Sequence, residues 1–284
     1  MQLGSYEHRK VFCQALTDHH IKYDLDQIPW PQLTEQDLQR LREIPFWSKV
    51  LQQKRQMASI ARKVALQTKP TKLKGAITLL AQETGRQVRL IERMMEFYQI
   101  PKVSIPTDDP PNALPPVLMD IAFDQYLDAY ILWGWFALAR EQQFLPEALL
   151  DVWEPILDED ARHSIFFANW TAGQRFSMSD NLRRLRTLWQ HVGRFIGLFD
   201  RFGRHIEDAT LPKTASTADI FMGQLTAARL LQHCLDAHDQ RLASVEPPLV
   251  KPQLAPELTQ WLLRILQAWP RRQVPTAANP SGTR

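Results

Sequence analysis

Polar side chains that could do chemistry recur at nearly the same spacing in two parts of the chain. The first set has spacings of 31 and 3 residues, and the second has spacings of 32 and 3. The two sets are Gln53, Thr84 and Gln87, and Asp128, Asp160 and His163. Carboxylates and an imidazole can bind divalent metals or act as acids and bases, whereas amides and a hydroxyl can hydrogen-bond to such groups. The second set therefore supplies the candidate catalytic residues, and the first set supplies candidate substrate-binding residues.

The sequences around these positions also match. Glu83-Thr-Gly-Arg-Gln87 aligns with Glu159-Asp-Ala-Arg-His163, which indicates an internal duplication. Glu83 and Glu159 precede the matched positions by one residue, so on a helix they point about 100° away from them. We expect both glutamates to pair with arginines on the helix exterior. Glu83 would become a ligand only if its helix contained a bulge.

The elements that must position these residues are helices. Prolines mark the joints between them, and the segments between the joints contain little glycine and no alternation of β-branched residues. We expect two short helices near the start of the chain. Longer ones are expected at about 46–67, 71–98, 116–143, 147–176, 179–207, 216–243 and 256–268. The sequence thus predicts an all-α protein.

Each of the four helices between 46 and 176 has an apolar stripe that is interrupted by polar residues near its middle. The interruptions are Gln53 in the first helix, Thr84 and Gln87 in the second, Asp128 in the third, and Asp160 and His163 in the fourth. Asp124 is an alternative to Asp128, but its spacing of 36 residues to Asp160 fits the duplication less well. Buried polar groups need partners, so these side chains must meet one another, a metal or a ligand.

This arrangement resembles the ferritin-like superfamily, whose di-iron members take one Glu from each of two helices and a Glu-x-x-His motif from each of the other two. The segment Asp158-Glu-Asp-Ala-Arg-His163 is similar to the fourth-helix motif of that group, and 101–116 stands where such a bundle needs its long crossover. The resemblance implies a ferritin-like four-helix bundle with additional N- and C-terminal helices. The expected parts are an N-terminal helical extension over 1–44, the four-helix core over 45–176, further helices packing on the core over 177–269, and a disordered tail over 270–284.

The metal ligands of that family are only half retained. Asp128, Asp160 and His163 are acceptable ligands, whereas neutral side chains occupy the three matching positions in the first half. Two divalent ions would bring four positive charges against two carboxylates in an apolar interior, so a two-metal site is not expected. The resemblance implies at most one non-haem iron or manganese, held by these three residues in a variant of the facial triad. The alternative is a metal-free network in which Gln53, Thr84 and Gln87 satisfy the carboxylates directly.

The function expected from this resemblance is that of an oxidoreductase of small-molecule metabolism that acts on an apolar or aromatic molecule in the bundle core. Trp135 is one of several aromatic residues that either wall the substrate pocket or pack the core. Two metal-free alternatives stay open. One is a cyclase, isomerase or lyase that uses Asp160 and His163 as acid and base, and the other is a ligand-binding or interaction protein without chemistry. A homodimer is also left open.

Composition argues against several other classes of protein. The longest apolar run covers 11 residues, 129–139, about half of the roughly 20 that span a bilayer, and the first ten residues form no apolar signal region. A cytoplasmic protein without a membrane span is therefore expected. The arginines between 183 and 204 fall on an expected amphipathic helix and read as a solvated face, so no nucleic-acid partner is expected. Cys13 and Cys234 are expected to be reduced thiols.

Overall fold

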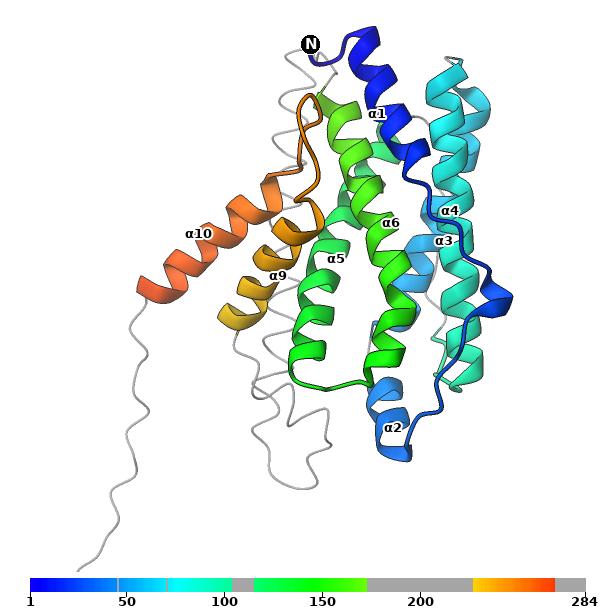
Figure 1. Ribbon diagram of the computed structural model, residues 1–284, viewed down its shortest axis with the longest axis vertical. Coiled ribbons are helices and arrows are strands. Elements are labelled where there is room, and N and C mark those ends of the chain that lie inside the picture. The colour runs from blue at the N-terminus through cyan, green and yellow to red at the C-terminus, as the bar shows by residue number, and fades with distance from the viewer. Residues whose placement is uncertain (45, 70, 104–114, 173–226, 269–284) are drawn as a thin grey trace, which may run out of the picture.

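The computed structural model describes residues 1–44, 46–69, 71–103, 115–172 and 227–268 (Figure 1). Within these ranges every regular element is helical, which confirms the prediction of an all-α protein. The elements are α1 (Tyr6–Asp18), the 3₁₀ helix η1 (Leu25–Gln27), α2 (Glu35–Glu43), α3 (Trp47–Gln67), α4 (Thr71–Phe97), α5 (Pro115–Glu141), α6 (Glu147–Ala172), α9 (Ala227–Arg241) and α10 (Leu254–Ala268).

The helices α3 to α6 begin and end within four residues of the predicted bounds. Pro155 lies inside α6 without ending it. The helix expected at 179–207, the first part of the one expected at 216–243, most of the connection at 101–116 and the tail at 270–284 fall outside the described residues.

Four long helices, α3 to α6, lie side by side, and we call them the central helices (Figure 1). Helix α3 packs along α4, and α5 packs along α6. The two pairs meet because α3 also contacts α5 and α4 also contacts α6. Outside them, α1 lies against α4 and α6, α9 lies against α5, and α10 packs on α9 and points away from the central helices.

Two separate hydrophobic clusters fill the space between the central helices. One cluster contains Val50 and Leu51 of α3 together with residues of α4 from Leu90 onward, and the other contains Met57 of α3 together with residues of α4 up to Ala81. The residues between these limits on both helices are mainly polar. The apolar core is therefore divided by one polar level, as the interrupted stripes predict.

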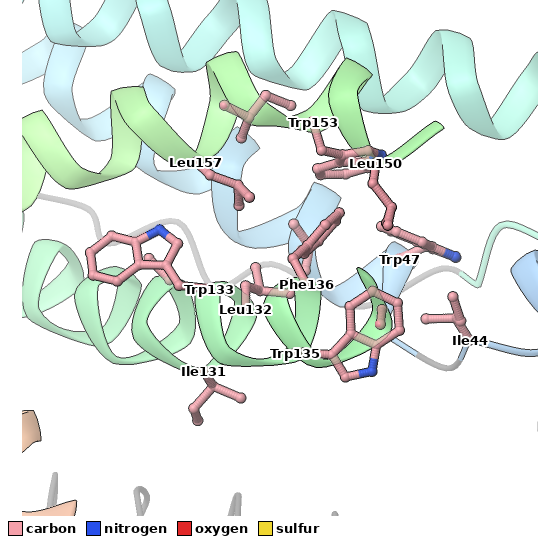
Figure 2. Close-up of a cluster of buried hydrophobic side chains, with 14 of the residues drawn as sticks. Ile44, Trp47, Ile131, Leu132, Trp133, Trp135, Phe136, Leu150, Trp153 and Leu157 are labelled. Atoms are coloured by element: carbon pink, nitrogen blue, oxygen red, sulfur yellow. The ribbon is translucent and has the colours of Figure 1, made fainter. Parts of the chain in front are cut away.

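Several aromatic rings pack together in the cluster that contains Val50 (Figure 2). The ring centroid of Trp153 lies 4.9 Å from that of Trp47 and 5.4 Å from that of Phe136. Trp135 packs edge-on against Phe46 at 5.2 Å and is 3% exposed. These contacts place Trp135 in the packed core, two helical turns from Asp128.

Helix α9 approaches α5 very closely at one point. A Cβ atom added to Gly134 would lie 2.4 Å from Sγ and 2.7 Å from the backbone nitrogen of Cys234, so only glycine fits there. None of the described helices is long and apolar enough to cross a membrane.

Candidate functional site

Charged and polar side chains of α3, α4, α5 and α6 meet at the level between the two hydrophobic clusters. We call them the polar layer: Gln53, Lys54, Glu83, Thr84, Arg86, Gln87, Asp128, Glu159, Asp160, Arg162 and His163. Several of them are almost fully buried, and Glu83 and Glu159 are only 1% and 0% exposed. Ions at such depth are stable only when each one is paired and hydrogen-bonded.

Glu83 of α4 receives three hydrogen bonds. His163 Nε2 lies 2.7 Å from one carboxylate oxygen, and Arg162 Nη2 and His20 Nδ1 lie 2.8 and 2.6 Å from the other. Burial by itself would raise the pKa of Glu83, but the hydrogen bond and charge of His163 and the charge of Arg162 outweigh it and lower the pKa to about 2. Glu83 is therefore ionised at neutral pH.

Glu159 of α6 is bound from the opposite direction. Arg86 donates to one of its carboxylate oxygens, and Gln87 Nε2 donates to the other at 2.9 Å. The Tyr23 hydroxyl lies 3.4 Å from the second oxygen, and the Arg86 guanidinium stacks 4.0 Å from the centre of the Tyr23 ring. Burial raises the pKa of Glu159, and the nearby charge of Glu83 adds to this rise; together they outweigh the opposing charges of His163 and Arg86.

The duplicated sequences thus exchange partners between two helices. The glutamate of the α4 copy binds Arg162 and His163 of the α6 copy, and the glutamate of the α6 copy binds Arg86 and Gln87 of the α4 copy. The prediction that both glutamates pair with arginines is confirmed, but the prediction that they do so on the helix exterior is wrong. A position 100° from the stripe is still buried here, because α1 and the segment after it cover α4 and α6.

The carboxylates of the predicted stripe have separate partners. Asp128 accepts a hydrogen bond from the Gln53 amide, and its other oxygen lies 3.5 Å from Lys49 Nζ. Burial raises the pKa of Asp128. Asp160 accepts hydrogen bonds from Lys54 and, at 3.2 Å, from Gln87. The amide contacts of the metal-free network are therefore present.

Thr84 does not take part in these carboxylate contacts. Its hydroxyl is buried and donates to the Leu80 carbonyl oxygen at 2.8 Å, one turn back in α4. A threonine in a helix interior often satisfies its hydroxyl in this way.

Sequence reasoning missed Lys54 altogether. Lys54 follows Gln53 and lies off the apolar stripe, yet its long side chain reaches inward and is 6% exposed. The sequence prediction did not say which arginines pair with the glutamates, but a signal was visible, since each copy of the duplicated sequence carries an arginine three residues after its glutamate, at Arg86 and Arg162. The spacing 3 places both residues of a copy on one face.

The three predicted metal ligands do not converge on one point. Asp128 contacts Gln53, Asp160 contacts Lys54, and His163 contacts Glu83. Among the residues that the structure describes, no group of three or more His, Cys, Asp or Glu side chains is arranged to hold a metal ion. Lys54 donates to one oxygen of Asp160, and Nε2 of His163 contacts Glu83, so two of the predicted ligands already have partners within the chain.

The polar layer also leaves almost no space. A cavity of about 10 Å³ lies between Gln53, Lys54, Asp128 and Asp160. This volume is near the lower limit for one water molecule. A cavity of this size is too small for an apolar substrate.

A much larger cavity, of about 580 Å³, opens between α5, α6 and the segment 250–254. Its walls are mostly apolar and include Ala122, Tyr126, Phe167 and Ala168. Ser164, the residue after His163, lies on the same wall. Two other cavities, of about 510 and 250 Å³, lie beneath the Pro29–Trp30–Pro31 segment and between α1 and α6. We call the 580 Å³ space the α5–α6 cavity.

A comparison with models of protein families, with curated proteins and with solved structures finds no match for this chain.

Proposed function

We propose that this protein binds an apolar small molecule in the α5–α6 cavity and does so without a metal. We further propose that the central helices form a four-helix bundle of ferritin-like type whose former metal level has become a network of ion pairs. The central observation is that the chain itself supplies the cations of the polar layer.

The charges of the layer are balanced from within. Glu83 is bound by Arg162, Glu159 by Arg86, and Asp160 by Lys54. In a two-metal bundle the ions would carry out this neutralisation, whereas here a divalent ion would have to displace a paired ammonium or guanidinium. Such a replacement would leave a buried cation without a partner, which costs several kcal/mol.

The α5–α6 cavity has the properties of a small-molecule site. Its volume of about 580 Å³ falls within the range of roughly 300–1,000 Å³ that is typical of such sites, and apolar walls with a few polar groups are typical of them too. The cavity lies against the hydrophobic cluster that contains Phe167, so an apolar ligand would extend the core.

An acid–base enzyme is the weaker alternative. Asp160 and His163 would have to release Lys54 and Glu83 before they could exchange protons with a substrate. The cavity of about 10 Å³ beside Asp160 offers a substrate no place to do so. We therefore prefer binding without chemistry.

Two measurements test the proposal. Purified protein incubated with iron(II) or manganese(II) without air and then desalted should retain far less than one ion per chain. If the wild-type protein retains one ion per chain and His163→Ala does not, the proposal that the protein works without a metal is overturned.

The second measurement is the melting temperature with naphthalene or 1-decanol, which should rise because a ligand that binds only the folded state stabilises it. Ala168→Trp fills the α5–α6 cavity and should abolish the rise. Thr78→Trp, on the exposed face of α4, is the matched control and should keep it. An equal rise in both variants would place the ligand elsewhere.

A further inference from the structure

The segment 250–252, which forms one wall of the α5–α6 cavity, is held in place by three buried polar side chains. Asn169 of α6 pairs with Val250 in both directions: its amide donates to the Val250 carbonyl at 2.9 Å, and its side-chain oxygen accepts from the Val250 N–H at 2.8 Å. Two residues later, the Pro252 carbonyl accepts from the Tyr126 hydroxyl at 3.2 Å and contacts His238 Nε2 at 3.0 Å.

These contacts are unusual for a connection between two helices, because irregular segments generally run over the surface. Asn169 is 0% exposed and His238 is 2% exposed. Lys251 lies between Val250 and Pro252, so its backbone is held in place on both sides.

Lys251 is the one charged residue among the described residues that line the cavity. No acidic side chain of the described chain lies within ion-pair distance of its ammonium. The polar layer shows the opposite pattern, since its cations are matched by carboxylates. A cation without a partner at the rim of an apolar space favours a ligand that brings one negative charge.

The start of α10 adds to the positive electrostatic potential at this cavity. Leu254, the first residue of that helix, also lines the cavity, and the free N–H groups of a first helical turn favour negative charge. The α5–α6 cavity therefore has apolar walls and one positively charged edge, formed by Lys251 and the start of α10.

We propose that the ligand of the α5–α6 cavity is an apolar chain or ring that ends in one carboxylate, and that this carboxylate pairs with Lys251. This inference rests on the binding function proposed above and names its ligand class. A single ammonium balances a single negative charge, which favours a monocarboxylate over a doubly charged phosphate monoester.

The test compares decanoate with 1-decanol, which share a ten-carbon chain and differ in charge. Calorimetric titration of the wild-type protein at pH 7.5 should give a dissociation constant about tenfold lower for decanoate. Lys251→Met keeps the apolar stem and should abolish this preference, whereas Lys251→Arg should keep most of it. Lys74→Met, at an exposed position of α4, is the control and should leave the preference unchanged.

The outcomes separate the two proposals. Equal affinity of the wild-type protein for the two compounds, or a preference for decanoate that persists in Lys251→Met, would overturn the role of Lys251 and leave the apolar site in place. If decanoate, 1-decanol and naphthalene all fail to bind, the binding function is overturned and the carboxylate proposal with it.

Discussion

Replacing Glu83 by glutamine should destabilise the protein more than replacing its counterpart Glu159. The substitution keeps the size of the side chain and removes its charge. Three donors would then face a neutral amide, among them Arg162 and His163. At Glu159, the single cation among the described residues that would lose an ion-pair partner is Arg86.

The magnitude for Glu83 follows from its pKa. Folding lowers that pKa from 4.5 to about 2, against the opposing effect of burial. Because each tenfold change in proton affinity is worth about 1.4 kcal/mol, the ionised carboxylate contributes roughly 3 kcal/mol to the free energy of unfolding. This value agrees with the cost of about 3–5 kcal/mol that removing one partner of a buried ion pair typically has. The pKa of Glu159 is raised instead, so its charge contributes less.

Urea unfolding at pH 7 measures the effect. We expect Glu83→Gln to lower the free energy of unfolding by about 3 kcal/mol, and Glu159→Gln to lower it by at least about 1 kcal/mol less. Glu92→Gln, which breaks the more exposed pair with Arg55, should cost under about 1 kcal/mol and serves as the control. A cost for Glu159→Gln equal to or above that of Glu83→Gln would refute the reasoning.

The pH dependence supplies a second measurement. A carboxylate whose pKa is lowered on folding stabilises the protein fully above its unfolded pKa, near 4.5, and loses that contribution as the pH falls toward about 2. The stability difference between the wild-type protein and Glu83→Gln should therefore shrink between pH 5 and pH 2. A difference that stays constant over this range would show that the charge of Glu83 is not its source.

Three further predictions concern packing and burial. Gly134→Ala should lower the free energy of unfolding by about 1–3 kcal/mol, because its Cβ would collide with Cys234, whereas Gly75→Ala, with open space around it, should raise the stability by up to about 1 kcal/mol; urea unfolding of both decides this. In the same assay Lys54→Met should lower the free energy of unfolding by about 3–5 kcal/mol, because it leaves Asp160 buried without its cation. Adding Asp160→Asn should recover part of this loss, and effects of the two substitutions that simply add would contradict the prediction. Both cysteine thiols should react with a disulfide reagent only after unfolding, because burial raises their pKa values; rapid labelling of native protein would contradict this.

Much of the helical architecture could be predicted from the sequence, because apolar residues at helical spacing and prolines at the joints are local signals. The bounds of α3 to α6 followed from them within four residues. The same periodicity showed that polar residues interrupt four stripes at one level, and the duplication paired Thr84 with Asp160 and Gln87 with His163. The metal-free alternative expected amide donors for the two carboxylates, and Gln53 does donate to Asp128.

The pairing within that level was decided only by the tertiary structure. A stripe defines the direction in which a backbone position points, but a long side chain can reach around the helix, as Lys54 does toward Asp160. Glu83 of α4 binds side chains of α6, and Glu159 of α6 binds side chains of α4. Which partners they find depends on how closely α4 and α6 approach and on which segment covers them. The α5–α6 cavity arises where α5 and α6 meet a segment that is more than 75 residues farther along the chain, a distance over which local periodicity carries no information. Sequence thus determined the helices and the level of the charges, and three-dimensional packing determined which charges meet and where space is left for a ligand.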